Sequence, residues 1–154
     1  MKQKNGSQRL DPYWFLEATI HQEGKSIFNL AYRLCGNREE AGEIARETFL
    51  RVLEKCHLFE SRLQVYTYLY RTTFALWKNR TRHKARQPAL DGQLPLLQKA
   101  LAGLTASENF TIILRDIEGK SHLEIAHIME CPYGTVKSRL ARAREQLRTN
   151  LCQK

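Results

Sequence analysis

The chain has 154 residues, 42% of them hydrophobic, so it can bury a core and form one medium domain or two small ones. Its formal net charge of +9 is unevenly placed: residues 61–90 carry seven basic and no acidic side chains, and residues 131–154 carry six basic and one acidic. Two basic blocks of this kind suit a polyanion such as nucleic acid, whereas one alone would fit a solvated surface.

The cysteines are widely spaced and form no CxxC pair, which argues against a disulfide framework or a zinc ribbon. The first residues, MKQKNGSQRLDPYWF, lack the apolar core of a signal peptide, and no apolar run approaches a membrane span. We therefore expect a cytoplasmic protein with reduced thiols and no membrane insertion.

The first predicted domain, residues 10–85, begins with Asp11 as N-cap and Pro12 as first helical residue. Gly24 leaves open whether this stretch is one helix or two, and Gly36 can end it in the left-handed conformation. A second helix opens at Asn37 with a capping-box-like pair. Its apolar stripe is expected to be buried and consists of Ala41, Ile44, Ala45, Thr48, Phe49, Val52 and Leu53.

A third helix is predicted from about Leu63 to Lys84, where aromatic and basic residues interleave without the strict alternation of a strand. Two prolines and an Asp-Gly pair in residues 86–95 mark a linker. The second predicted domain, residues 96–154, contains capping boxes at Thr105–Glu108 and Ser121–Glu124 and a last helix whose buried positions extend to Leu151. The expected fold class is all-α, with two small helical domains.

Residues 121–145 carry the most specific pattern in the chain: a short helix, a turn containing Cys131 and Pro132, and a second helix from about Gly134–Thr135. This is the arrangement of a helix-turn-helix, whose second helix enters the DNA major groove. With Val136, Leu140 and Ala143 turned inward, the outward side of that helix and its flanks carry Thr135, Lys137, Ser138, Arg139, Arg142 and Arg144. Arginine bonds guanine in a bidentate way, and hydroxyls and lysine suit phosphates.

The run GTVKSRLARAR, Gly134 to Arg144, resembles the recognition helix of bacterial sigma factors of the extracytoplasmic-function (ECF) group, and HLEIAHIM resembles the helix before it. This resemblance implies contacts with the −35 promoter element by Thr135, Lys137, Ser138, Arg139 and Arg142, and Arg144 on the flank completes the predicted set. Glu130 stands at a turn position where the family often has glycine, and a left-handed conformation would strain it.

Residues 27–84 are similar to the second conserved region of the same family. The resemblance of EEAGEIARETFLRV implies contacts with the clamp helices of the largest subunit of core RNA polymerase, made by Glu40, Glu43, Glu47 and Arg51. The aromatic-basic stretch aligns with the part that melts the −10 element, and its predicted contacts are Tyr68, Arg71, Lys78, Asn79, Arg80 and Arg82. For the rings of Tyr70, Phe74 and Trp77 a place in the core is favoured.

The resemblance implies a sigma factor that directs core RNA polymerase to promoter DNA under the control of an anti-sigma factor. We expect no cofactor, no metal and no enzymatic activity, since no nucleotide-binding glycine loop or nucleophile elbow is present. Two alternatives stay open. One is a stand-alone helix-turn-helix regulator, which leaves the Glu39–Val52 similarity without a purpose; the other is a metal-dependent sensor using His122, His127 and Cys131.

Overall fold

The computed structural model describes residues 12–84 and 96–152, and within these ranges the chain is helical with no strand, which confirms the expected all-α class. The first domain contains α1 (Pro12–Cys35), α2 (Arg38–Glu54), a 3-10 turn (Cys56–Leu58) and α3 (Arg62–Lys84). The second contains α4 (Leu96–Leu101), α5 (Ala106–Ile112), a π-helical turn (Ile113–Ile117), α6 (His122–Met129) and α7 (Tyr133–Cys152). The expected linker and the expected N-cap Asp11 lie outside the described residues.

Local signals set the ends of several helices. Helix α1 is continuous, so Gly24 does not interrupt it. It ends before Gly36, whose φ of 69° is in the left-handed region. Asn37 caps α2, because its side chain accepts the Glu40 backbone N–H at 2.9 Å. Both predicted capping boxes are confirmed, at Thr105 before α5 and at Ser121 before α6. Each box satisfies backbone N–H groups that have no partner within the first helical turn.

The core of the first domain lies between α1, α2 and α3. Ile27, Leu30, Ile44 and Leu69 are fully buried, and Tyr70 and Trp77 belong to the same core, as predicted. The expectation that the whole stripe of α2 is buried was wrong at Leu53, which is 40% exposed. The buried residues of α2 lie along one line from Ala41 to Val52. Leu53 follows Val52 directly, so its side chain lies about 100° further around the helix and away from that line.

The core of the second domain lies between α5, α6 and α7 and includes the π-helical turn. Phe110, Ile125 and Leu140 are each at most 2% exposed. The predicted burial of Leu151 was wrong, because its side chain is 56% exposed. The Asn150 amide donates to the carbonyls of Ala100 (3.1 Å) and Ala102 (2.9 Å), so Asn150 faces α4 and Leu151, the next residue along α7, turns outward.

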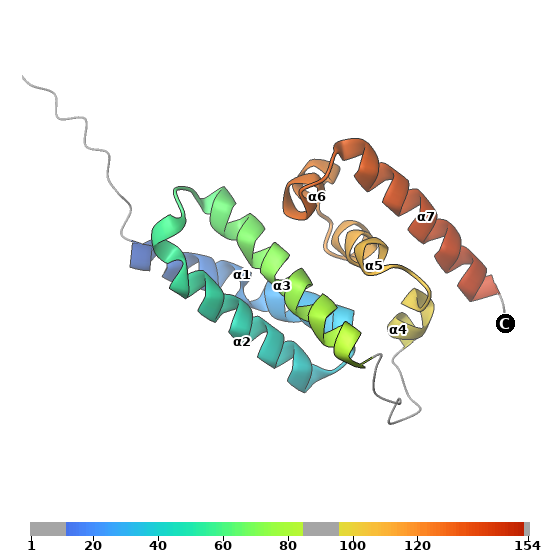
Figure 1. The fold of residues 1–154 in the computed structure, drawn as a ribbon, viewed down its shortest axis with the longest axis horizontal. Helices are drawn as coiled ribbons and strands as arrows, with labels where there is room; N and C mark the ends of the chain where they lie inside the picture. The colour runs from blue at the N-terminus through green and yellow to red at the C-terminus, as the bar shows by residue number, and fades with distance from the viewer. Residues whose placement is uncertain (1–11, 85–95, 153–154) are drawn as a thin grey trace, which may run out of the picture.

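The two domains pack side by side, with α3 next to α6 and α1 next to α4 (Figure 1). The Phe74 ring on α3 stacks on the Phe110 ring on α5, with 4.6 Å between ring centroids. No helix within residues 12–84 and 96–152 combines the length and the apolar character needed to cross a bilayer.

Two glycine substitutions should change stability in opposite directions. Gly24→Ala should raise the free energy of unfolding by about 0.5–1 kcal/mol, because alanine costs less backbone entropy within a helix and its Cβ would meet nothing within 4 Å. Gly36→Ala should lower it by about 1–2 kcal/mol, since φ there is 69°. Urea unfolding of both variants is the measurement. Equal effects would contradict the assigned backbone conformations.

Candidate nucleic-acid and polymerase interfaces

The helix-turn-helix is closed by a tight turn between α6 and α7. Glu130 lies in the left-handed region at φ 49° and ψ 48°, where glycine would be free of strain. The next backbone N–H, of Cys131, donates to the Ala126 carbonyl at 3.1 Å and closes the C-terminal end of α6. The strained position foreseen from the sequence is therefore adopted by a glutamate, and α7 begins at Tyr133, slightly earlier than predicted.

The inward face of α7 is the predicted one. Val136, Leu140 and Ala143 are each at most 2% exposed. Lys137, Ser138 and Arg142 are consequently exposed on the other side of the helix, and Thr135 and Arg139 are half-buried. The Arg139 guanidinium lies 3.6 Å from the Cys131 sulfur, which places it beside the turn. This surface can present a guanidinium, an ammonium and a hydroxyl to a DNA groove.

Arg144 differs from the other predicted −35 residues, because Asp116 holds it in a bidentate ion pair. Nη2 and Nε of Arg144 lie 2.6 and 3.1 Å from the two carboxylate oxygens. This hydrogen bonding raises the pKa of Arg144 above its ordinary value. The pair joins α7 to the π-helical turn, so Arg144 contributes to the domain's own packing.

Tyr133, the first residue of α7, and His122, the first residue of α6, were not among the residues predicted to contact DNA. The Tyr133 hydroxyl lies 3.3 Å from Nδ1 of His122, and the two rings meet edge to face with centroids 5.5 Å apart. The Lys137 ammonium lies 5.9 Å from the Tyr133 ring centroid. Their proximity arises from the folding of α6 against α7, for which residue spacing gives no signal. They add an aromatic and an imidazole beside the predicted DNA-facing side.

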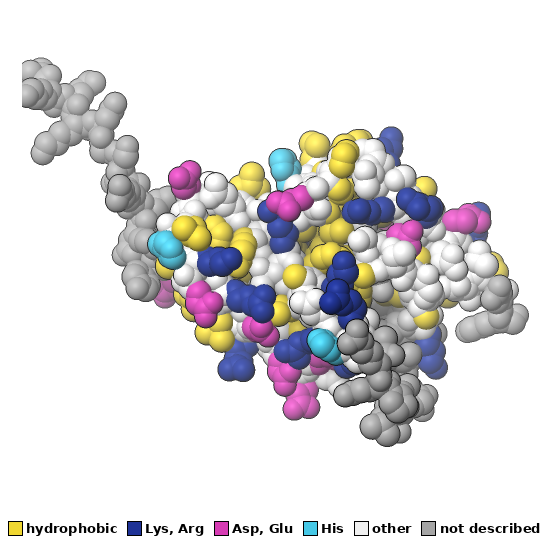
Figure 2. Space-filling model, viewed as in Figure 1, with side chains coloured by type: hydrophobic (Ala, Val, Ile, Leu, Met, Phe, Trp, Pro, Cys, Tyr) yellow, Lys and Arg dark blue, Asp and Glu magenta, His cyan; other side chains and the backbone are white. Residues whose placement is uncertain are grey.

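In the first domain, carboxylates predicted to contact polymerase are paired with two basic residues of α3, of which Arg80 is also a predicted −10 contact. We call this set the α2–α3 ladder: Glu40, Glu43 and Glu47 on α2 with Arg80 and Lys84 on α3. The N–O distances are 2.6 Å for Arg80–Glu43, 3.5 Å for Arg80–Glu47 and 2.5 Å for Lys84–Glu40. Figure 2 shows acidic and basic side chains interleaved over these two helices.

Pairing in the α2–α3 ladder shifts pKa values on both helices. A hydrogen bond from Arg80 holds the pKa of the Glu43 carboxyl below its usual value, and Glu43 in turn raises the pKa of Arg80. Arg51 also pairs within α2, with Glu47 at 2.8 Å. The acidic face of α2 is therefore partly neutralised by α3 before any partner approaches.

The predicted −10 residues lie in four different environments. Lys78, Asn79 and Arg82 are exposed along the C-terminal half of α3. Tyr68 is half-buried, its ring 5.2 Å from Phe59 between centroids and 5.5 Å from the Lys55 ammonium.

Arg80 belongs to the ladder, and Arg71 turns away from the exposed row toward the second domain. Its Nε donates to the Ile128 carbonyl at 2.9 Å. The predicted −10 residues therefore do not form one continuous free surface.

The two halves of the chain match two conserved regions of one family, in the expected order. Residues 19–87 match Sigma-70 region 2, and residues 94–147 match Sigma-70 region 4. The chain is 31% identical to the ECF RNA polymerase sigma factor SigW of Bacillus subtilis, over 81% of this chain and 82% of that protein. The chain belongs to the ECF sigma factors.

Two further comparisons agree with this assignment. The ECF RNA polymerase sigma factor SigE of Mycolicibacterium smegmatis is 30% identical over 95% of this chain, which spans 64% of that relative's length. The sigma factor RpoE of Bartonella quintana, solved in complex with the anti-sigma factor NepR, has a similar fold, with a TM-score of 0.66 and 25% identity. The superposition covers 90% of this chain and 97% of RpoE. This family consists of transcription initiation factors, not enzymes.

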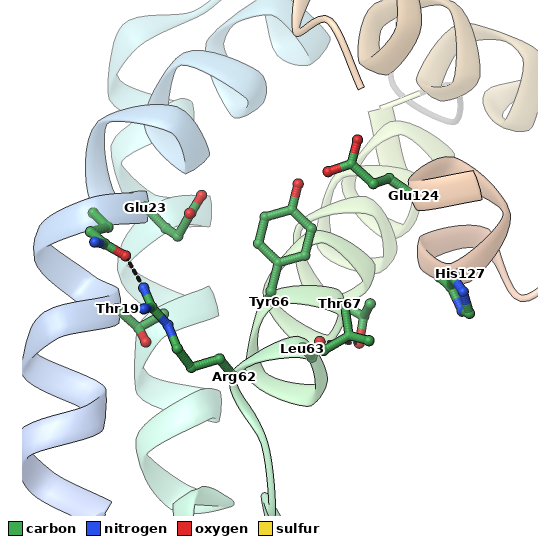
Figure 3. Close-up of a pocket in the computed structure, with 9 residues that line it drawn as sticks. Thr19, Glu23, Arg62, Leu63, Tyr66, Thr67, Glu124 and His127 are labelled. Carbon is green, nitrogen blue, oxygen red and sulfur yellow. Dashed lines mark hydrogen bonds between the residues drawn. The ribbon is translucent and has the colours of Figure 1, made fainter. Parts of the chain in front are cut away.

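This sigma factor has a cavity of about 340 Å³ between its two domains. Figure 3 shows Glu23 from α1, Tyr66 from α3 and Glu124 from α6 directed toward one another across it. Burial raises the pKa of the Tyr66 hydroxyl. Within the described part of the chain, no three His, Cys, Asp or Glu side chains are grouped so as to hold a metal ion. His127 lines this cavity, whereas His122 contacts Tyr133.

Removing Arg80 should return the Glu43 carboxyl toward its ordinary acidity. In Arg80→Gln we expect the pKa of Glu43 to rise, because the hydrogen bond and charge that favour the carboxylate are lost. Glu43 titrates with a depressed pKa in the folded state, so its pairing stabilises the protein above the unfolded pKa and is lost as pH falls through the folded one. NMR titration of the side-chain carboxyl measures this. An unchanged Glu43 pKa would show that the Arg80–Glu43 pair does not form in solution.

Proposed function

We propose that this sigma factor binds core RNA polymerase, directs it to specific promoters and initiates transcription there. The observation that carries the proposal is the presence of both conserved regions in order, with the basic face of α7 exposed on a closed helix-turn-helix. A stand-alone regulator would use the second region alone and has no role for region 2. We further propose that the protein acts in the cytoplasm, beside the polymerase, and performs no catalysis of its own.

The −35 role is assigned to the exposed side of α7. Lys137, Ser138 and Arg142 supply it, with Arg139 and Thr135 at the end nearest the turn. The N-terminal end of α7 carries the positive end of the helix dipole, which favours an approaching phosphate. Among the described residues no carboxylate pairs with Arg142, whereas Asp116 pairs with Arg144. Arg142 is therefore the best placed for bidentate base readout.

The −10 role is assigned to α3, and its exposed row of Lys78, Asn79 and Arg82 fits a single DNA strand through positive charge. The polymerase role is assigned to α2, through the ladder carboxylates Glu40, Glu43 and Glu47 with Arg51. An acidic helix face suits a partner of opposite charge.

We also propose control by an anti-sigma protein. RpoE, which this chain resembles in fold and at 25% identity, was solved with the anti-sigma factor NepR. A protein that covers α2, α3 or the recognition helix would withhold the same surfaces from polymerase or promoter DNA.

Polymerase association tests the proposed function directly, by pull-down with purified bacterial core enzyme. Glu43→Arg/Glu47→Arg should weaken binding at least about tenfold, since two attractive charges become repulsive. Because Arg80 pairs with both carboxylates, Arg80→Ala is the necessary companion: it breaks the same internal pairs and leaves the carboxylates in place. Binding by Arg80→Ala should be retained. Glu17→Arg/Glu60→Arg, at exposed sites on α1 and the α2–α3 connection, matches the charge change.

Loss of binding in all three variants would show that polymerase does not read the α2 carboxylates specifically. Failure of the folded wild-type protein to bind core enzyme, with DNA binding intact, would contradict the proposal and leave a stand-alone DNA-binding regulator.

Recognition-helix variants should separate base readout from phosphate contact. Arg142→Ala should cost about 1–3 kcal/mol of binding free energy and relax sequence preference, as expected for a lost base contact. Lys137→Ala should weaken binding to all sequences alike and reduce the salt dependence by about one phosphate contact. Fluorescence anisotropy with duplexes selected by the wild-type protein from a random pool measures both. If Arg144→Ala proves more damaging to sequence preference than Arg142→Ala, the assignment is wrong.

A further inference from the structure

The cavity lined by α1, α3 and α6 has the size of a small-ligand site. Its volume of about 340 Å³ lies at the lower end of the range, roughly 300–1,000 Å³, that is typical of pockets for small molecules. Figure 3 shows the side chains of Glu23, Tyr66 and Glu124 directed across it. These three residues lie outside the sets predicted to contact polymerase or promoter DNA, so the proposed function leaves the cavity unexplained.

The two carboxylates that face the cavity each keep one oxygen free. Glu23 accepts the Tyr70 hydroxyl at 3.2 Å, and Glu124 accepts the Ser121 backbone N–H at 2.7 Å, in both cases through Oε2. Among the described residues, neither carboxylate forms an ion pair and neither Oε1 has a hydrogen-bond donor. Two negative charges that face each other across a cavity repel, and a cation between them would relieve that repulsion.

The Tyr66 hydroxyl is a third acceptor at the same cavity. Its oxygen is buried and has no hydrogen-bond partner within the described part of the chain. The Lys120 ammonium lies 5.0 Å from the centroid of this ring and 4.9 Å from that of Tyr70, so the protein already places an ammonium against these rings. Arg62 is the only arginine or lysine that lines the cavity, and its guanidinium donates to the Gln22 side-chain oxygen.

We propose that this cavity binds a small aliphatic diamine, with one ammonium group at Glu23 and the other at Glu124. An ammonium donates charge-assisted hydrogen bonds to a carboxylate and is attracted to the face of an aromatic ring. The aliphatic part would lie against the Tyr66 ring and Leu63, which also lines the cavity. A metal cation fits less well, because Ca²⁺ takes about six to eight oxygen ligands, and within residues 12–84 and 96–152 no three metal-ligating side chains are grouped.

The overall charge of the protein makes such binding a local property of the cavity. The chain carries a formal net charge of +9, so its long-range field repels a dication. Saturable binding of a diamine would therefore have to come from carboxylates close to the ligand. The proposal goes beyond the proposed function and needs neither polymerase nor DNA, so it can fail without affecting that function.

The test is isothermal titration calorimetry of the full chain with putrescine, and with the neutral diol of the same chain length, at constant ionic strength. Glu23→Gln/Glu124→Gln removes both charges while glutamine still accepts the Tyr70 hydroxyl and still suits a capping box. Glu17→Gln/Glu54→Gln, at exposed sites on α1 and α2, is the matched control. Circular dichroism verifies that both double variants are folded.

We expect the wild-type protein to bind putrescine saturably at one site per chain, and Glu17→Gln/Glu54→Gln to match it. Glu23→Gln/Glu124→Gln should bind at least about tenfold more weakly, because its hydrogen bonds to the ammonium groups lose their ionic partner. Absence of saturable putrescine binding by the folded wild-type protein would overturn the proposal. Equal weakening in both double variants would overturn it too, since net charge would then explain the binding. Equally tight binding of the diol would overturn the assignment of an ammonium ligand.

Discussion

Helix α3 has to satisfy two packing partners at once, and the rest of the fold is arranged around it. Its inner side, with Val65, Leu69 and Leu76, completes the core formed with α1 and α2. Its outer side stacks Phe74 on Phe110 and places Arg71 at the end of α6. A helix buried from two directions needs apolar and aromatic residues around most of its circumference, which is why α3 lacks the single apolar stripe seen in α2.

Close contact between α2 and α3 depends on small polar residues in their interface. The hydroxyls of Thr48 and Thr73 lie 3.3 Å apart, and each bonds the carbonyl four residues earlier in its own helix. These buried hydroxyls are therefore satisfied without larger side chains between the helices. The resulting proximity places the carboxylates of α2 within reach of Arg80 and Lys84, so the α2–α3 ladder follows from the packing beneath it.

The two domains differ in which of their basic residues have carboxylate partners. In the first domain, Arg80 and Lys84 on α3 are paired with carboxylates of α2, whereas Lys78 and Arg82 on the same helix are exposed. In the second, α7 keeps Lys137 and Arg142 exposed, while its neighbours Arg144 and Arg148 are paired with Asp116 and Glu145. Positive charge without a carboxylate partner therefore lies on the side of α7 that the helix-turn-helix presents to DNA, where it can steer association.

The sequence by itself determined the helices, the capping boxes at Thr105 and Ser121 and the inward face of α7, because these depend on residues three or four positions apart. It also identified the family, since the recognition-helix run is contiguous. Only the tertiary structure decided the partners of the charged residues. Arg71 meets a carbonyl 57 residues away and Arg80 a carboxylate 37 residues away, and no local pattern encodes such pairings. Their geometry is set by how whole helices pack.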